Sequence, residues 1–172
     1  MQSDLTTLPN GLRIISASRP GTESVSLGIW INTGSAREEE EINGLSHFLE
    51  HMVFKGTPTR TSFQIDAEIE DAGGQTNAYT SREITSFYAK MLKDDAELAL
   101  DVLADIVLNA SFPDEEVVKE RDVVIQEIKQ TIDTPDDIIF DYLQQQAYAG
   151  QPLGRPILGS IEKVSGFTAD DL

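Results

Sequence analysis

The segment 44–56 restricts the fold of this 172-residue chain most strongly, because it joins a helical pattern to the only two histidines in the sequence. Its apolar residues recur at positions i, i+3, i+4, i+7 and i+8, the spacing of one stripe along an α-helix. They are Leu45, Phe48, Leu49, Met52 and Val53. Gly56 and Pro58 follow as signals that end a helix. The segment is therefore expected to form an amphipathic helix that buries this stripe.

His47 and His51 lie four residues apart on this helix, on the side away from the apolar stripe. Two core histidines would share the stripe, so this pair is expected either to face solvent or to bind a metal ion. Imidazoles at i and i+4 can both reach one ion, and Glu50 lies close enough to contact a water molecule on it. The order His-x-x-Glu-His is a known pattern of zinc peptidases. The spacing therefore favours a metal site over a solvated pair.

Any metal in this chain must be held by histidine and carboxylate ligands, because the sequence contains no cysteine. With no third histidine, the third ligand of a catalytic zinc ion is expected to be an aspartate or a glutamate. The helix expected after Pro113 offers Glu120 and Glu127, which are seven residues apart and share one face. Most glutamates on helices simply face solvent, so spacing alone does not choose between these two.

The formal net charge of −17 argues against nucleic acid as a partner, because phosphates require a basic surface. It favours cationic ligands, although acidic helix surfaces also provide simple solubility. The sequence has no continuous apolar run of the length that a membrane span requires, so no span is expected. The first residues lack a basic stretch followed by an apolar one, which leaves the cytoplasm as the expected compartment.

The remaining pattern predicts an α+β domain that occupies residues 1–172 as one unit. Strands are expected where apolar residues alternate or flank a tight turn: 5–8, 12–16, 24–31, 76–81 and 84–92. Further helices are expected after capping signals: 61–71, from 94 onward, 113–132 and 136–147. Residues 38–41 are expected to form a solvated acidic loop, residues 150–159 another loop, and residues 167–172 the start of a helix.

Several runs of the sequence match one protein family. They are residues 6–12, 44–57, 73–74, 77–80, 120–127 and 150–159. On these runs the chain resembles the insulinase/pitrilysin family of zinc metallopeptidases along essentially its whole length. It is most similar to the branch that contains the catalytic subunit of mitochondrial processing peptidase and its bacterial relatives. The resemblance implies a largely antiparallel sheet with helices packed on one side, in a single N-terminal metallopeptidase domain that is truncated at its C-terminus.

The resemblance also assigns a role to each residue of the motif. His47, His51 and Glu127 match the zinc ligands of the family, and Glu50 matches the general base that takes a proton from the attacking water. Glu120 matches a second glutamate that supports the site. The resemblance therefore implies one Zn²⁺ ion per chain and the hydrolysis of peptide bonds.

A substrate and a partner follow from the same resemblance. The strand residues Asn77, Ala78 and Tyr79 match a segment that helps to hold an extended peptide, such as a targeting presequence. The acidic balance of the chain adds the expectation that the peptide is cationic. The family pairs two related halves, so a second homologous half or subunit is expected. The mitochondrial matrix is the alternative to a bacterial cytoplasm. A non-catalytic partner subunit or a peptide-binding module is the alternative function, although the intact motif argues against it.

Overall fold

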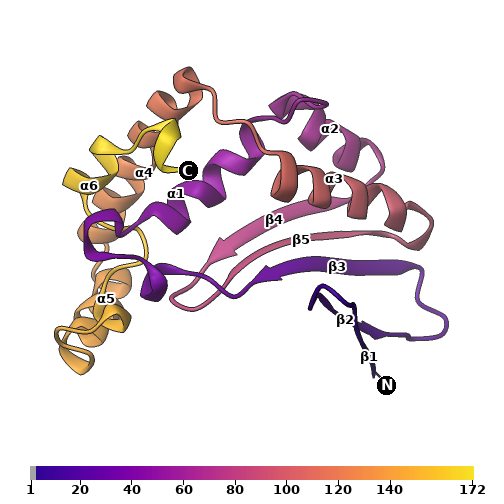
Figure 1. The fold of residues 1–172 in the computed structure, drawn as a ribbon, viewed down its shortest axis with the longest axis horizontal. Helices are drawn as coiled ribbons and strands as arrows, with labels where there is room; N and C mark the ends of the chain where they lie inside the picture. The colour runs from indigo at the N-terminus through magenta and orange to yellow at the C-terminus, as the bar shows by residue number, and fades with distance from the viewer. Residues whose placement is uncertain (1–2) are drawn as a thin grey trace.

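The structure is a computed structural model that describes residues 3–172 (Figure 1). Its strands form two antiparallel sheets and are β1 (Ser3–Thr7), β2 (Arg13–Ala17), β3 (Ser24–Ile31), β4 (Gln75–Thr80) and β5 (Thr85–Leu92). Its α-helices are α1 (Leu45–Met52), α2 (Ser62–Asp71), α3 (Ala96–Asn109), α4 (Asp114–Asp133), α5 (Pro135–Ala147) and α6 (Ile161–Gly166). Short 3₁₀ helices occupy Ser35–Arg37, Glu40–Ile42, Val53–Lys55, Lys93–Asp95, Pro152–Gly154 and Ala169–Asp171.

The main sheet has the strand order β3-β5-β4, with both neighbouring pairs antiparallel. Side chains alternate across it, so Phe87, Ala89 and Met91 of β5 point to its buried face. Within residues 3–172, β4 pairs only with β5, which leaves the other edge of β4 without a strand partner. Helix α1 lies against β4 (Figure 1), so this unpaired edge is close to the helix that carries the two histidines.

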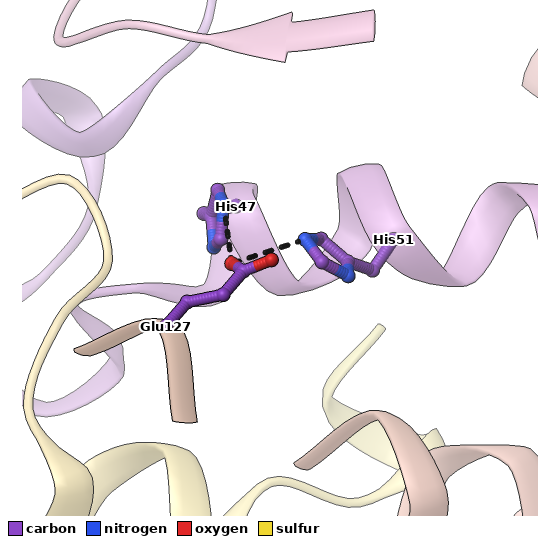
Figure 2. Close-up of side chains that lie close together, drawn as sticks. All are labelled: His47, His51 and Glu127. Carbon is purple, nitrogen blue, oxygen red and sulfur yellow. Dashed lines mark ion pairs between the residues drawn. The ribbon is translucent and has the colours of Figure 1, made fainter. Parts of the chain in front are cut away.

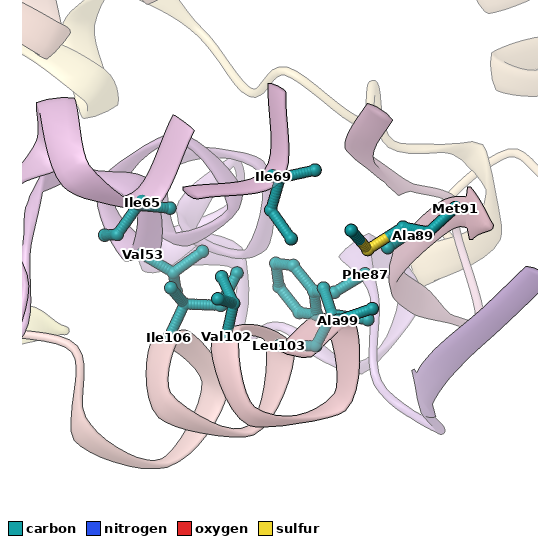
Figure 3. Packing of buried hydrophobic residues seen from close by; sticks show 10 residues of the cluster. All are labelled: Val53, Ile65, Ile69, Phe87, Ala89, Met91, Ala99, Val102, Leu103 and Ile106. Atoms are coloured by element: carbon teal, nitrogen blue, oxygen red, sulfur yellow. The ribbon is translucent and has the colours of Figure 1, made fainter. Parts of the chain in front are cut away.

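The first hydrophobic cluster lies where α2 and α3 cover one face of the main sheet (Figures 1 and 3). It consists of Val53, Ile65, Ile69, Phe87, Ala89, Met91, Ala99, Val102, Leu103 and Ile106. The apolar residues of α3 recur at helical spacing and form its buried side; they include Ala99, Val102, Leu103 and Ile106. Burial of each larger aliphatic side chain stabilises the fold by roughly 1.5–3 kcal/mol. The expected antiparallel sheet with helices packed on one side is confirmed.

A second hydrophobic cluster joins α1 to α4 and α6. It consists of Phe48, Met52, Val117, Val124, Ile128, Val164 and Phe167. Phe48 and Met52 are fully buried here, whereas Leu49 and Val53, on the neighbouring side of the same helical segment, pack into the first cluster. The apolar stripe expected on α1 therefore serves two cores instead of one, because the helix runs between the main sheet and α4.

Three segments differ from the sequence expectation. The α-helix expected over 44–56 ends at Met52 and continues as a 3₁₀ helix. Residues 161–166 form α6, which is too short for its periodicity to be recognised in the sequence. Glu38, expected in a solvated loop, is only 8% exposed. None of the helices between residues 3 and 172 combines the length and the apolar character needed to cross a membrane.

Candidate metal centre

His47 and His51 project from α1 toward Glu127 on α4 (Figure 2). The Nε2 atoms of the two histidines lie 3.6 and 3.5 Å from Oε2 of Glu127. One ligand atom from each of the three residues lies within 4.8 Å of the others, close enough to share a single ion. The histidine side chains are only 14% and 20% exposed, so they are not the solvated pair that the sequence left open.

The second hydrophobic cluster brings these residues together. Val124 and Ile128 of α4 pack in the same cluster as Phe48 and Met52 of α1, which holds the two helices side by side. Glu127 precedes Ile128 on α4, so its side chain projects beside the cluster instead of into it. There it faces the two histidines. The apolar spacing of two separate helices thus sets the position of the third candidate ligand.

Glu120, the other candidate on α4, occupies a different place. It is 6% exposed, and its Oε2 lies 3.0 Å from Nδ1 of His51. Its Oε1 lies 2.6 Å from Nζ of Lys55, which forms an ion pair with it. A carboxylate that accepts the Nδ1–H of a histidine fixes the ring and leaves Nε2 free to bind a metal. Glu120 therefore orients His51 by binding Nδ1, the ring nitrogen that faces away from Glu127. The ion pair with Lys55 keeps Glu120 in this position.

Burial controls the charge of His47. Loss of solvent contact and, to a smaller extent, the neighbouring His51 together lower the pKa of His47 to about 4. His47 is therefore neutral near pH 7, the form in which an imidazole can bind a metal. Its Nδ1 atom is buried and has no hydrogen-bond partner among the described residues.

Glu50 lies on α1 with its carboxylate partly buried against Thr80, at the end of β4. Burial raises the pKa of the Glu50 carboxyl above its ordinary value, although Thr80 and the charge that His51 can carry oppose this shift. Its Oε2 atom is buried without a hydrogen-bond partner in the described part of the chain. Glu50 therefore offers an unpaired acceptor oxygen of increased basicity beside the two histidines.

The donor set at this site fits zinc. Two imidazole nitrogens and one carboxylate oxygen, without a thiolate, form one of the ligand sets of catalytic zinc sites. Such a set leaves a coordination position open for water or substrate. The hydrogen bond between His51 and Glu120 is the kind of support that these sites use to orient a ligand.

The three candidate substrate residues are divided between the two faces of β4. Ala78 packs against the first hydrophobic cluster, whereas Asn77 and Tyr79 alternate with it and point to the opposite face of the sheet. The backbone N–H of Ala78 donates to Oδ1 of Asn77 at 2.8 Å instead of to a neighbouring strand. Their side chains therefore do not form one common surface. The feature that the three residues share is the backbone at the unpaired edge of β4, near α1.

Residues 13–161 match the family described as insulinase, peptidase family M16. The chain belongs to this family. It is 46% identical over 99% of its length to an Arabidopsis thaliana protein described as "Probable mitochondrial-processing peptidase subunit beta, mitochondrial". It is 48% identical over 96% of its length to a Bacillus subtilis protein described as an uncharacterized zinc protease. Its relatives thus include mitochondrial and bacterial proteins, and some of them are named zinc proteases.

The fold is also shared with solved M16-type structures. The crystal structure of a protease from Helicobacter pylori superimposes with a TM-score of 0.92 at 26% identity, over 99% of this chain and 41% of that one. The Arabidopsis and Bacillus proteins are matched over 32% and 41% of their own lengths. The M16 chain described here therefore spans about a third to two fifths of the length of the relatives it matches.

Sequence reasoning did not single out Lys55, which contacts Glu120, and did not predict that Glu38 is buried. Lys55 follows His51 by four residues, so it lies one turn further along the same side of the helical segment and reaches Glu120. That spacing could have identified it. The burial of Glu38 carries no such signal, because residues 38–41 are four consecutive glutamates and only the tertiary fold buries the first of them.

Proposed function

We propose that this M16 chain is the zinc-binding catalytic part of an endopeptidase that hydrolyses extended peptides. The observation that carries the proposal is the convergence of His47, His51 and Glu127 beside the unpaired carboxylate oxygen of Glu50. His47, His51 and Glu127 would hold the zinc ion. The names of the relatives as zinc proteases support the same reading.

Zinc bound there would supply a Lewis acid and lower the pKa of a water molecule. Glu50 accepts the proton that the water loses as its oxygen adds to the carbonyl carbon of the peptide. Glu50 then gives this proton to the amine nitrogen as the C–N bond breaks, so the carboxylate ends unchanged. The burial that raises the pKa of Glu50 makes it a better base for the first transfer and still allows it to act as the acid in the second.

The residues around the motif keep this geometry in place. Glu120 accepts from Nδ1 of His51 and thereby directs the Nε2 atom of His51 toward Glu127. Lys55 neutralises the buried Glu120, which would otherwise be an uncompensated charge. Glu120 and Lys55 therefore act on the site through His51.

The substrate is proposed to lie extended along the unpaired edge of β4, where main-chain hydrogen bonds would hold it as an added strand. Asn77, Ala78 and Tyr79 form this part of the edge, and a substrate carbonyl would replace Asn77 as the acceptor for the N–H of Ala78. The net charge of −17 favours cationic peptides. Because some relatives are named subunits of mitochondrial-processing peptidase, targeting presequences are the proposed substrate class.

A longer protein is the proposed setting for this domain. The relatives are about two and a half to three times as long as the matched region, which supports a second homologous half or subunit as the partner. The chain is then the N-terminal metallopeptidase domain of that protein. A bacterial cytoplasm is the proposed compartment, and the mitochondrial matrix is the alternative that the mitochondrial relatives support.

The test combines zinc stoichiometry with peptide turnover on the same preparation. The 172-residue chain and a longer polypeptide that contains it are each loaded with Zn²⁺, and the bound metal is measured. Both are then assayed with one basic and one acidic peptide at two salt concentrations. We expect one zinc ion per chain, hydrolysis of both peptides by the longer protein, and a preference for the basic peptide that weakens as salt rises.

Each outcome of this test separates the alternatives. Absence of bound zinc would contradict the proposal as a whole. Zinc binding without hydrolysis by either polypeptide would leave a peptide-binding module or a non-catalytic subunit. We expect slower hydrolysis by the 172-residue chain alone, because the proposed second half would add positive charge near the developing oxyanion. Loss of one such donor typically costs about 10²–10³-fold in rate.

A further inference from the structure

The start of α1 lacks the usual cap. Its N-cap residue is Gly44, at a φ of +105°, which has no side chain to accept from the first turn. The N–H of Gly44 instead donates to Oε2 of Glu38 at 2.8 Å, and the N–H of Ser46 donates to Oε1 of Glu38 at 2.7 Å. One carboxylate from outside the helix thus accepts from two backbone donors at its start.

Glu38 differs sharply from the acidic residues that follow it. It is 8% exposed, whereas residues 39–41 are exposed. Its Oε2 also accepts from Nδ2 of Asn43 at 2.9 Å, so three donors converge on one buried side chain. A negative charge at this point also faces the positive end of the α1 dipole. The three donors and the helix dipole compensate the buried charge of Glu38. A glutamate in a solvated loop would not require such compensation.

A distant segment closes over the same turn. Arg155 donates from Nη1 to the backbone carbonyl of Glu38 at 2.7 Å, and Asn43 donates to the carbonyl of Pro156 at 3.1 Å. Gly159, at a φ of +76°, crosses so closely that any side chain there would overlap the carbonyl of Asn43. The 150–159 loop therefore packs over Glu38 and holds this turn against the start of α1.

We infer that Glu38 is a positioning residue for the metal centre: it anchors the first turn of α1 and thereby fixes the direction in which His47 points. Ser46, which Glu38 binds through its N–H, directly precedes His47. The role rests on the proposed zinc site, because it acts through a proposed zinc ligand. Glu38 itself does not touch the metal ligands in any described contact, so it acts only through the helix.

The first experiment measures zinc affinity of the 172-residue chain by competition with a chromophoric chelator near neutral pH. Glu38→Gln keeps the size of the side chain, but it has a single acceptor oxygen and turns an NH₂ group toward backbone donors. We expect zinc affinity to fall by about tenfold, the lower end of the effect of removing support from a metal ligand. Glu39→Gln, the same change at the exposed neighbouring position, is expected to leave zinc affinity unchanged.

A second control separates positioning from a general loss of stability. Asp105→Asn also removes a buried carboxylate that accepts several hydrogen bonds, but those bonds join α3 to residues 57–60 instead of to α1. Denaturant unfolding ranks the two variants by stability, and zinc affinity is measured where both are fully folded. We expect Asp105→Asn to bind zinc as the wild type does. An equal loss of affinity in both variants would overturn the positioning role.

Amide hydrogen exchange in the unaltered, zinc-free chain tests the anchor even if Glu38→Gln does not fold. Ser46 and Glu115 occupy the same second position of α1 and α4, and the N–H of Glu115 has no acceptor among the described hydrogen bonds. We expect the amide of Ser46 to exchange at least about tenfold more slowly than that of Glu115, after correction for intrinsic rates. Equal protection would overturn the inference.

These results also distinguish the inference from the proposed function. If the wild type binds no zinc, the proposed function fails and the role of Glu38 fails with it. If the wild type binds zinc and Glu38→Gln binds it equally well, only the role of Glu38 fails. Slow exchange at Ser46 together with a zinc defect specific to Glu38→Gln supports both.

Discussion

Two polar clusters in this molecule, each of which contains a buried carboxylate, differ in how completely their buried groups are paired. The first, here called the Arg60 network, consists of Thr57, Thr59, Arg60, Glu68, Asp101, Asp105 and Asn109. Asp105 accepts on Oδ2 from Thr57, Thr59 and Arg60, and on Oδ1 from Asn109. Arg60 donates further to Glu68 and Asp101. Both oxygens of the buried carboxylate are thus satisfied, and the network joins α2, α3 and the segment before α2.

The candidate metal centre contains similar groups but leaves some of them unpaired. Nδ1 of His47 and Oε2 of Glu50 are buried without a hydrogen-bond partner among residues 3–172. The contacts of Glu127 with the two histidines, at 3.5 and 3.6 Å, are longer than good hydrogen bonds. Buried polar atoms are nearly always paired, so exceptions require an explanation. The proposed function supplies one for His47 and Glu50, because a zinc site with a general base would hold an ion and move a proton at these positions.

The pKa values of Asp105 and Glu50 shift in opposite directions, because the balance between burial and hydrogen bonding differs at the two carboxylates. Burial tends to raise the pKa of Asp105, but hydrogen bonds from Asn109, Thr57, Arg60 and Thr59 outweigh it and hold that pKa well below its usual range. At Glu50, burial outweighs the interactions that favour the charged form, so its pKa rises. A complete hydrogen-bond network fixes a charge, whereas an incomplete one leaves a proton acceptor.

The largest expected effect concerns the unpaired oxygen of Glu50. Glu50→Gln keeps the shape of the side chain but removes its ability to accept a proton, so peptide turnover should fall by about 10²–10⁴-fold. Zinc content should not change, because Glu50 is not one of the three proposed ligands. Metal analysis and a peptide assay on the same sample test this, with Glu41→Gln as an exposed control on the approach to α1. Loss of zinc in step with activity would make Glu50 a ligand.

The next effect concerns the ligands themselves. His47→Ala, His51→Ala and Glu127→Gln should each weaken zinc binding by more than the roughly 100-fold that marks the upper range for supporting residues. Equilibrium zinc affinity is the measurement, and Asp122→Asn, an exposed carboxylate on α4, is the matched control for Glu127→Gln. Wild-type zinc affinity in Glu127→Gln would move the third ligand elsewhere, and Glu120 would be the first candidate.

A smaller effect is expected at Glu120, which is buried like Asp105 but is hydrogen-bonded to His51, a proposed zinc ligand. Glu120→Gln removes the charge that holds Nδ1–H of His51 and leaves Lys55 without its partner. Zinc should still bind at saturation, with affinity or turnover lowered by about 10–100-fold. Glu115→Gln, at an exposed position of α4, should change neither. A complete loss of zinc in Glu120→Gln would contradict the supporting role and identify Glu120 as a ligand.

Much of the fold follows from local patterns in the sequence. The alternation in β3 and the tight turn between β4 and β5 predict antiparallel strands. The capping signal at Thr61 or Ser62 predicts the start of α2, and in the structure Thr61 is the cap. The i, i+4 spacing of His47 and His51 also predicts that both reach one point. These features depend on neighbouring residues along one element, which a single sequence contains.

The remaining features depend on how elements meet. Glu120 and Glu127 share one face of α4, so their spacing cannot separate them; the contact of Glu120 with Lys55 and His51 does. Glu38 belongs to an acidic run, and it is buried where the start of α1 and the 150–159 loop meet around it. The two cores on either side of α1 likewise arise from the placement of α4, which no local periodicity records.

The smallest expected effect belongs to the paired cluster and concerns pH. The pKa of Asp105 is lower in the folded chain than in the unfolded one, where an aspartate titrates near about 3.9. Its contribution to stability is therefore fully present above about pH 4 and is lost as pH falls toward the folded pKa. Asp105→Asn removes that contribution at every pH. At pH 6 it should lower the unfolding free energy by about 1.5 kcal/mol, the value of a hydrogen bond to a charged group.

The difference in unfolding free energy between the wild type and Asp105→Asn should therefore shrink as pH falls from about 6 to about 3, because Asp105 takes up a proton in the unfolded wild type while the folded form is still ionised. Urea unfolding of the zinc-free proteins at several pH values measures it, with Glu115→Gln as an exposed control. A difference that stays constant with pH would mean that Asp105 is not held ionised by its partners. It would then remove the contrast between a closed network and an open site, since neither carboxylate would have its charge fixed by its surroundings.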